Sequence, residues 1–546
     1  MKRKAVAAVL TAVMVASMFT GCGSDNGSSS AKSASAASAA SAANDTVDED
    51  GKVNGIMYQE GLPLVDEGDY TFSIFCDDSS ESGEFIMLDE FKKQTNVDVD
   101  LKIYPYETAT ERLNLDLNSG DYADVIGGWT LSDNAILTYG VNQGVFIPLE
   151  DYFEKYCPNI SAILDLPGVR EKMTAPDGHI YTIPYVCADT TVGYSPYINT
   201  KWLENVGMSM PTTTDEFEAV LKAFKEQDAN GNGDASDEIP FSTDPNNKHI
   251  EAMAGYFGLP MNKLGIAIQN EKVVYGGVSD TYREFLSWFH KLYAEGLVDV
   301  ELYTQDSSTW EGKGNQDLYG VSIAYGSGEF TGIPAAEERG DFDSMPVLNT
   351  DKDGIWLRDT EGFSVYRTQA VITNKAEHPE IICRWFDNAF ALENGIGCNR
   401  GPVGVIVNKE DDGYHAIDTT TLSEEDQEKY SWGNLWPQSL PKYLPVDFEF
   451  VEEHPMYDEK KATEEAYEAN LTKEIIPSYW IDLDKIDTFS DTNTAIKDFF
   501  EQQQAQFVCG ELDIDNDADW QAYVDGMYSL GLEDWVATQG IEEIAK

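Results

Sequence analysis

The sequence is poor in basic residues and lacks the common catalytic motifs. Lysine and arginine number 37 against 97 aspartates and glutamates, so the formal net charge is −60 at pH 7. This charge repels nucleic acids and anionic lipid headgroups, which argues against both as binding partners and favours an uncharged ligand. Only six histidines are present, and the chain has no G-x-S-x-G, H-E-x-x-H or P-loop sequence. Composition therefore gives no sign of an enzyme.

Cysteine is rare as well, with seven in 546 residues. The chain has no C-x-x-C pair and no cysteine–histidine cluster, so neither a zinc site nor a redox centre is expected. Cys22 stands directly after an apolar segment. We expect the other six to be buried free thiols, with disulfide pairing as the open alternative: Cys76, Cys157, Cys187, Cys383, Cys398 and Cys509.

The first 22 residues have the pattern of an export signal. A basic start, MKRK, precedes the apolar run AVAAVLTAVMVASMF, which is too short for a comfortable membrane span. The following TGCGS looks like a bacterial lipobox, in which cleavage after residue 21 exposes Cys22 for acylation, although Phe19 stands where leucine is preferred. An ordinary secretory signal is the alternative. Two or more acyl chains, such as palmitate, would anchor the protein at the extracytoplasmic face of the cell membrane.

Residues 22–67 are predicted to form a lipidated tether. Their first part, residues 23–48, consists mostly of Gly, Ser and Ala without a face that could pack, which is typical of a disordered linker. In this interpretation the globular part starts at residue 68.

The pattern of apolar residues changes at Tyr70. Residues 70–76 alternate, residues 85–91 have helical spacing, and residues 97–101 alternate again, which predicts a strand, a helix and a strand of a parallel sheet. The same switch recurs over residues 181–224 and 363–390. Because 546 residues are too many for one compact core, we expect an α/β fold with two lobes.

Residues 228–238, DANGNGDASDE, have the spacing of a calcium loop. Acidic or amide side chains stand at positions 1, 3, 5 and 7, and glycine stands at position 6, where a Ca²⁺ loop bends sharply. Position 12 is Ile239 rather than glutamate, and two acidic residues come early instead. We predict a structural Ca²⁺ ion in the second lobe, with a solvated acidic turn as the alternative. The candidate ligands are Asp228, Asn230, Asn232, Asp234, Asp237 and Glu238.

Several longer segments together resemble the family 1 extracellular solute-binding proteins, the receptors of sugar-importing ABC transporters. They include ADVIGGWTLSDNAILTYGVNQGVFIPLEDY, DGHIYTIPY, INTKWLENVGMSMPTTTDEFEAVLKAF and ITNKAEHPEIICRWFDNAF, and the resemblance covers most of residues 68–535. It implies a monomeric, two-lobed periplasmic-binding-protein-like (class II) fold with an interlobe cleft and a C-terminal helical region. Such a receptor captures an oligosaccharide, delivers it to the ABC transporter permease and breaks no bond.

The resemblance also implies where the lobes begin and end. Lobe 1 would comprise residues 68–187 and 364–430, and lobe 2 residues 188–363 and 431–546 with the C-terminal helices. The chain would cross between the lobes near residues 187–193 and again near residues 363–369.

Aromatic rings stack on the apolar faces of sugars, and polar side chains bind their hydroxyl groups. Trp129 follows a short strand and two glycines, and it matches a sugar-stacking position of the family. Asp77 and Ser79 end the first strand, where relatives bind sugar hydroxyls, with a polar turn as the alternative. Tyr185 and Tyr325 match cleft positions of the family. Further ring candidates on loops are Trp310 and Trp356.

Two other functions stay open at this point. A surface-anchored polysaccharide hydrolase or lyase would also need aromatic residues and calcium, together with a pair of carboxylates that have tuned pKa values. A receptor for peptides or another small solute would share the fold but respond to no glycan.

Overall fold

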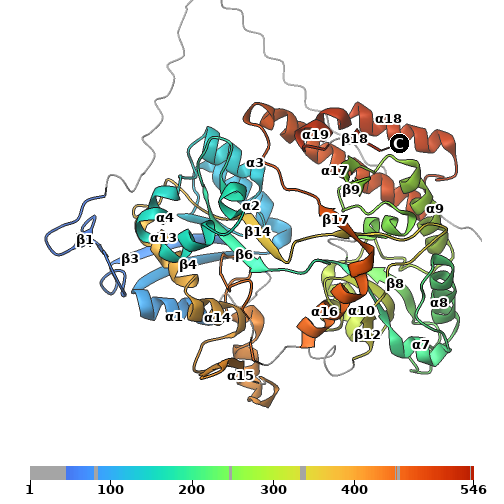
Figure 1. Cartoon of the computed structure of the whole chain (residues 1–546), viewed down its shortest axis with the longest axis horizontal. Coiled ribbons are helices and arrows are strands. Elements are labelled where there is room, and N and C mark those ends of the chain that lie inside the picture. Colours follow the sequence, from blue (N-terminus) through green and yellow to red (C-terminus); the bar gives the residue numbers. More distant parts are fainter. Residues whose placement is uncertain are drawn as a thin grey trace, which may run out of the picture. The chain divides into compact units, whose positions relative to one another are not determined.

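The computed structural model describes residues 45–78, 84–244, 249–332, 340–417, 419–448, 450–451, 455–541 and 543–545. Cys22, Ser79 and the Ser/Ala-rich segment up to residue 44 therefore lie outside the described residues. The described residues, from Asp45 onward, form one compact unit, which contains two lobes (Figure 1).

Lobe 1 is built on a five-stranded sheet in the order β4-β3-β5-β14-β6. β3 runs parallel to β4 and β5, whereas β14 is antiparallel to β5 and β6. The strands are β3 (Tyr70–Asp77), β4 (Val97–Tyr104), β5 (Val125–Gly127), β6 (Thr182–Ala188) and β14 (Phe363–Ile372). The helices are α1 (Ile86–Thr95), α2 (Tyr106–Ser119), α3 (Asp133–Ala135), α4 (Glu150–Tyr156), α5 (Pro158–Leu164), α6 (Val169–Met173), α13 (Pro379–Ala389), α14 (Leu392–Arg400) and α15 (Glu424–Lys429).

The apolar periodicity explains the elements of this lobe. Tyr70, Phe72, Ile74 and Cys76 are buried on β3, as the alternation predicts, and the predicted helix and second strand are present as α1 and β4. α13 begins with a proline at its first turn, where the missing N–H costs nothing, and buries its apolar stripe in the core of lobe 1.

Lobe 2 contains a four-stranded sheet, β12-β7-β11-β8, and a three-stranded sheet, β18-β10-β9. α8 begins as its sequence predicts, because Thr213 Oγ1 accepts the Glu216 N–H at 3.2 Å. The strands are β7 (Ser195–Asn199), β8 (Ile239–Thr243), β9 (Ile266–Gln269), β10 (Lys272–Tyr275), β11 (Tyr319–Ala324), β12 (Phe342–Ser344) and β18 (Glu543–Ile544). The helices are α7 (Thr200–Val206), α8 (Thr214–Glu226), α9 (Asp280–Ala294), α10 (Ser307–Asn315) and α11 (Gly328–Thr331).

Two segments connect the sheets of the two lobes. Residues 189–194 lead from β6 to β7, and residues 359–362 lead from β13 (Trp356–Arg358) to β14. They are bonded to each other: the Asp189 N–H donates to the Gly362 carbonyl at 3.1 Å, and the Asp359 N–H donates to the Thr191 carbonyl at 3.0 Å. We call this pair the hinge segments.

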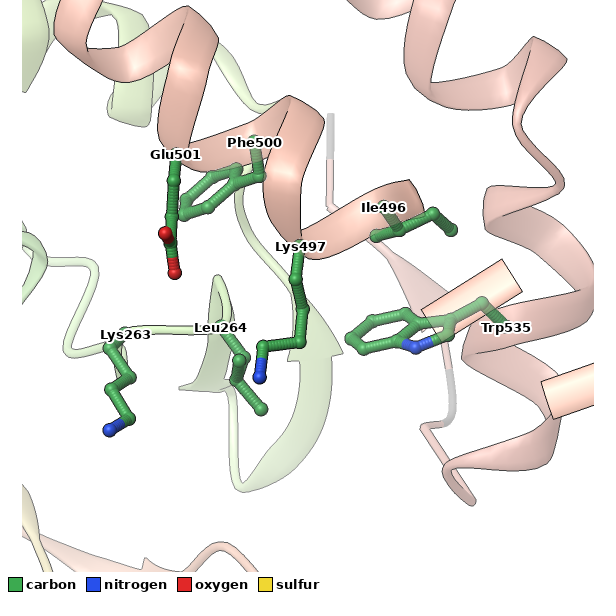
Figure 2. A pocket seen from close by; sticks show the side chains of 7 residues that line it. All are labelled: Lys263, Leu264, Ile496, Lys497, Phe500, Glu501 and Trp535. Carbon is green, nitrogen blue, oxygen red and sulfur yellow. The ribbon is translucent and has the colours of Figure 1, made fainter. Parts of the chain in front are cut away.

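The C-terminal part contacts both lobes. Ile481 and Ile486 belong to an apolar cluster of lobe 1, whereas most of α17 packs in the core of lobe 2. Leu264 faces Ile496 and Phe500 of α17 and Trp535 of α19 across a space that leaves no room for a ligand (Figure 2). The elements are α16 (Pro455–Tyr467), β17 (Leu471–Ile475), α17 (Ile486–Cys509), α18 (Asp517–Ser529) and α19 (Leu532–Thr538).

Two expected boundaries need correction. Residues 45–67 were assigned to the tether, but they form the hairpin β1 (Lys52–Val53) and β2 (Met57–Tyr58), and Val53 and Met57 are buried in the core of lobe 1. Trp436 and Leu440 were assigned to lobe 2, yet they are buried in the core of lobe 1 as well. In both segments most residues are polar, and the few apolar side chains, which the composition does not reveal, pack in the core of lobe 1.

The six cysteines within the described residues are free thiols, and Cys509 is the exposed one. In the part of the chain that the structure describes, no helix is both long and apolar enough to cross a membrane.

Candidate functional site

Three aromatic rings form what we call the aromatic platform: Trp129, Tyr185 and Tyr366. Tyr185 and Tyr366 stand directly opposite each other on β6 and β14, and their rings stack with centroids 5.5 Å apart. The Trp129 ring meets Tyr366 edge-on at 5.2 Å and is 46% exposed, which is unusual for so large an apolar side chain. The register of the sheet therefore brings together two rings that are 181 residues apart, and an exposed tryptophan extends them.

Asp77 fixes the backbone beside the platform. Its carboxylate accepts the Trp129 N–H at 2.9 Å and the Thr130 N–H at 2.5 Å, and it also bonds the Thr130 hydroxyl. Gly128, with φ of 129°, permits this approach, because a Cβ atom there would collide with the Asp77 carboxylate. Asp77 is fully buried, and burial raises the pKa of its carboxyl group. It positions Trp129 and has no surface to offer a ligand.

Asp189, in the first hinge segment, links the platform to lobe 2. Its Oδ1 accepts the hydroxyl of Tyr325, which follows β11 of lobe 2, at 3.3 Å, and its Oδ2 accepts the hydroxyl of Tyr366 at 3.3 Å. Ser364 donates to the same Oδ2 at 2.5 Å. Tyr325, a predicted site residue, therefore lies within two hydrogen bonds of the platform.

Carboxylates of lobe 2 and of the second hinge segment also lie in this region. Glu311, Glu329 and Asp359, which we call the acidic wall, are exposed to solvent, yet protein surrounds them closely enough for burial to raise the pKa of each carboxyl group. The pKa reaches about 7 for Glu329 and about 6 for Asp359.

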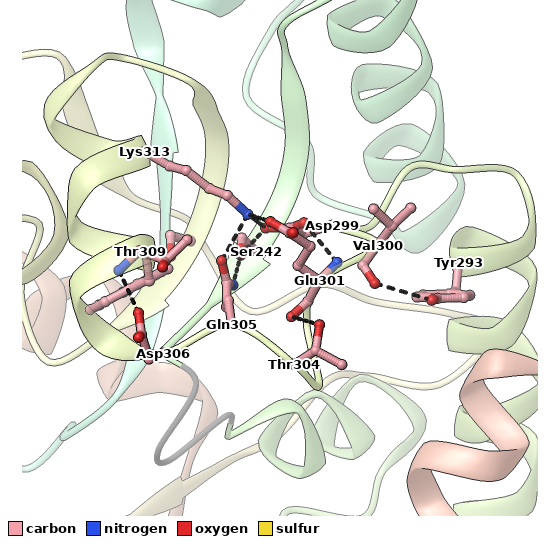
Figure 3. A network of polar contacts seen from close by, with 12 residues as sticks. Ser242, Tyr293, Asp299, Val300, Glu301, Thr304, Gln305, Asp306, Thr309 and Lys313 are labelled. Atoms are coloured by element: carbon pink, nitrogen blue, oxygen red, sulfur yellow. Dashed lines mark hydrogen bonds and ion pairs between the residues drawn. The ribbon is translucent and has the colours of Figure 1, made fainter. Parts of the chain in front are cut away.

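A buried ion pair holds α10, which carries Glu311. Lys313 Nζ contacts Asp299 Oδ2 at 2.9 Å and donates to Gln305 Oε1 at 2.8 Å, and the Gln305 amide bonds Ser242 at the end of β8 (Figure 3). The network ties α10, and with it Glu311, to the sheet of lobe 2.

The structure does not bring the other two tryptophan candidates to this region. Trp310 is buried against Phe330, and its indole N–H donates to Ser322 at 3.2 Å. Trp356 is 2% exposed in the core of lobe 2. Neither ring has exposed surface for a ligand, so both sequence-based assignments are corrected. Trp310 lies on α10 and Trp356 on β13, and each element turns its large ring into the core of lobe 2.

The loop over residues 228–238 folds around oxygen atoms. Asp228 Oδ2, Asn230 Oδ1 and Asn232 Oδ1 each accept a backbone N–H of the loop at 2.7–3.0 Å. Asp228 Oδ1 and Glu238 Oε2 are buried and have no hydrogen-bond partner. Two carboxylate oxygens in this state are costly unless a cation binds them, so the donor set fits a hard cation such as Ca²⁺. Asp237 differs, because its oxygens accept the amides of Asn230 and Asn232.

The site contains residues that the sequence did not single out: Tyr366, Asp189, Glu329 and Asp359. Tyr366 lies in an alternating strand, FSVYRTQAVI. It could have been proposed as the partner of Tyr185 if the pairing of β6 with β14 had been known. Asp189 follows directly on β6, so the strand-end criterion that selected Asp77 also applies to it. The acidic wall has no sequence signal that separates it from the other carboxylates.

Comparisons with known proteins agree with this fold. The family model of the bacterial extracellular solute-binding protein matches residues 78–395. The chain belongs to that family. Its relatives include the fructooligosaccharide ABC transporter substrate-binding protein FusA of Streptococcus pneumoniae, which is 31% identical over 411 residues, covering 73% of this chain and 70% of FusA.

Solved structures of this solute-binding family share the fold of the chain. An EF-hand mutant of Streptococcus pneumoniae FusA in complex with fructo-nystose superposes with a TM-score of 0.75 at 27% identity, covering 86% of this chain and 98% of that one. Alginate-binding protein AlgQ2 without calcium ion superposes with a TM-score of 0.69 at 22% identity, covering 88% and 99%, a likeness that concerns the fold alone. The two-lobed α/β architecture predicted from the sequence is thereby confirmed.

Proposed function

We propose that this solute-binding protein captures a neutral oligosaccharide on the aromatic platform and delivers it to the permease of an ABC importer. The observation that carries the proposal is the exposed Trp129 ring beside the stacked Tyr185–Tyr366 pair. Such rings cover the apolar faces of a sugar, while Asp189, Tyr325 and the acidic wall offer oxygen atoms to its hydroxyl groups. Closure of the lobes on the sugar would create the surface that a permease recognises.

The charge of the site supports a neutral rather than an acidic sugar. Asp189 bonds Tyr366 of the platform, and its charge acts on the Asp359 carboxyl group, whereas two cations, Lys460 and Lys442, are buried, with Lys442 Nζ 5.7 Å from the centroid of the Tyr185 ring. A uronate would meet like charges in a partly desolvated region, which disfavours its binding. FusA, which is shown with fructo-nystose, makes fructooligosaccharides the first ligands to examine.

The protein is proposed to release its sugar unchanged. A carboxyl group with a pKa near 7, as burial gives Glu329, is also a property of general acids, so the hydrolase alternative is tested directly. Purified protein is titrated with fructo-nystose, a maltooligosaccharide, an oligouronate and a mixed peptide pool in a calorimeter, and each sugar is then analysed for products. We expect saturable heat with one neutral oligosaccharide and no new reducing ends. New reducing ends would identify a hydrolase, and heat with peptides alone would identify a peptide receptor.

Calcium is proposed as a structural ion in lobe 2. Support comes from the two orphaned carboxylate oxygens of Asp228 and Glu238 and from the EF-hand in FusA. When bound, the ion would neutralise these carboxylates and staple the loop between α8 and β8, with Asp228, Asn230, Asn232, Asp234 and Glu238 as its candidate ligands. Metal analysis of the purified protein tests this, and a calcium-free protein with no thermal shift on adding calcium would exclude it.

Attachment through acylated Cys22 to the extracytoplasmic face of the cell membrane is likewise proposed. Support comes from the apolar run and the TGCGS sequence that follows it, and from membership of an extracellular family. Cys22→Ala is expected to release the protein from the membrane fraction into the medium of cells that lack an outer membrane, as judged by immunoblotting. Retention of the Cys22→Ala protein on the membrane would exclude the lipid anchor. A monomer is expected in solution.

A further inference from the structure

α16 is not part of either hinge segment, yet its charged side chains bind the first of them. The helix lies beside the hinge segments and packs on β12 of lobe 2 (Figure 1). Three of its side chains, Glu459, Lys460 and Glu464, point to chain segments that belong to the site or the hinge. The contacts of each are specific.

Lys460 joins the hinge to the loop that carries Tyr325. Its Nζ donates to the Gly193 carbonyl at 2.8 Å and to the Tyr325 carbonyl, and it lies 4.0 Å from the centroid of the Tyr325 ring. The residue is 4% exposed, and burial lowers the pKa of its amino group to about 8. A buried ammonium group without acceptors would be costly, so these carbonyls and this ring fix Lys460 in one place.

The flanking acidic residues complete the attachment. Glu464, one turn further along α16, accepts the Thr191 N–H at 2.5 Å and the Thr191 hydroxyl at 3.0 Å. Glu459 accepts the Ser327 N–H and the Ser327 hydroxyl, each at 2.8 Å, just after Tyr325. Lys460 and Glu464 therefore bind residues 191–193 of the first hinge segment. Lys460 and Glu459 bind residues 325–327, which follow β11.

The hinge segment is held from the opposite side as well. The Gly193 N–H donates to Asp359 Oδ2 at 2.7 Å, so Gly193 is bound through its N–H by the second hinge segment and through its carbonyl by Lys460. A rotation of residues 191–193 during lobe motion would either break these hydrogen bonds or move α16 and Asp359 together with the hinge segment. The Tyr325 carbonyl and ring contact the same Lys460 amino group that binds Gly193.

We propose that α16 is a hinge clamp, in which Lys460 and Glu464 are positioning residues that couple the backbone of residues 191–193 to Tyr325 and thereby set the affinity for the ligand. The clamp rests on the proposed function only for its effect on sugar binding; its effect on the hinge is independent of any ligand. Lys460 has no surface to touch a sugar, so it acts through Gly193 and Tyr325. Charge-assisted bonds to backbone groups are strong, and three of them bind two residues of the first hinge segment: Glu464 binds Thr191, and Lys460 and Asp359 bind Gly193.

The test compares Lys460→Met with Lys461→Met, which removes the same charge from the exposed neighbouring position on α16. Amide hydrogen exchange over residues 189–194 is measured without sugar, and affinity for fructo-nystose is measured by calorimetry. We expect Lys460→Met to speed exchange of this segment at least tenfold and to weaken sugar binding at least tenfold, with Lys461→Met close to wild type in both. Lys460→Arg, which keeps the charge, should recover part of the exchange protection.

Equal exchange in Lys460→Met and Lys461→Met would overturn the clamp, whatever the affinity. If Lys460→Met does not fold, Glu464→Gln replaces it, with Glu465→Gln as its exposed control. Wild-type protein that binds no sugar would contradict the proposed function, while the exchange comparison would still decide on the clamp. Loss of affinity with unchanged exchange would also refute the clamp, since the hinge would then not be the route of the effect.

Discussion

The two lobes contribute to the site by different means. Lobe 1 supplies aromatic rings from sheet strands, and their positions are set by strand register and by the Asp77 bonds to the backbone of Trp129. Lobe 2 supplies Tyr325, Glu311 and Glu329 from helices and a strand-end loop, and the second hinge segment supplies Asp359; side-chain networks set these positions. The lobe-1 half therefore depends on the backbone fold of its own lobe, whereas the lobe-2 half depends on α10, α16 and the hinge segments.

This difference suggests a division of labour in binding. Stacking on a preformed platform gives affinity without much loss of conformational freedom, because the rings are already held. We expect hydrogen bonds from the lobe-2 half to a sugar to form when the lobes approach, and to distinguish one sugar from another. We expect changes in lobe 1 to lower affinity for every sugar, and changes in lobe 2 to alter closure, stability and selectivity.

Calcium removal is expected to have the largest effect, and on lobe 2 alone. If Ca²⁺ binds the loop at one hundred times its dissociation constant, chelation costs about 2.7 kcal/mol of stability. We expect a chelator to lower the melting temperature and to speed hydrogen exchange in α8 and β8, while exchange in β6 and β14 stays unchanged. Asp228→Asn should reproduce the effect, and Asp351→Asn, an exposed acidic residue of another loop of lobe 2, should not. Faster exchange in both lobes would contradict the confinement of the ion to lobe 2.

Trp129→Ala is expected to weaken binding of every sugar that the protein accepts. Loss of the stacking ring should cost about 1–3 kcal/mol, the scale for removing a large apolar side chain from a contact. Calorimetry with at least two oligosaccharides measures the change. Tyr528→Ala is the control, because Tyr528 of α18 is an exposed aromatic residue of similar exposure, at 43% against 46% for Trp129. Unchanged affinity in Trp129→Ala would remove this ring from the site.

Tyr325→Phe and Tyr366→Phe test the lobe-2 half and the lobe-1 half of the site separately, because both hydroxyl groups bind the Asp189 carboxylate. Each removes a hydroxyl group that lies 3.3 Å from Asp189, one from lobe 2 and one from lobe 1. Each loss should cost about 0.5–1.5 kcal/mol, the usual net value of a hydrogen bond. We expect Tyr325→Phe to shift small-angle scattering of the free protein toward a more open form and Tyr366→Phe to leave it unchanged. Equal scattering from both variants would show that the Tyr325 bond plays no part in closure.

The difference between the lobes also explains how far the sequence predicts the molecule. Alternation and helical spacing predict β3, α1 and β4 because these elements bury one face, and Trp129 stands out because glycines and polar neighbours surround it. Pairing of Tyr185 with Tyr366 depends on a register between distant strands, which periodicity does not encode. Trp310 and Trp356 were assigned wrongly because the residues around a tryptophan do not show whether its ring is buried in the core or exposed in a site.

The smallest expected effect is the pH dependence that Glu329 adds to stability. Its pKa is raised by burial from 4.5 to about 7, so the folded protein binds this proton more tightly than the unfolded chain does. The contribution is therefore favourable at low pH and is lost as the pH rises from 4.5 to about 7. Because the side chain is exposed, solvent screens the effect and keeps it small. Urea unfolding at pH 5 and pH 8 should show Glu329→Gln gaining stability relative to wild type at pH 8 and not at pH 5. The exposed Glu361→Gln is the charge-matched control, and the same gain in that variant would assign the effect to net charge instead of the acidic wall.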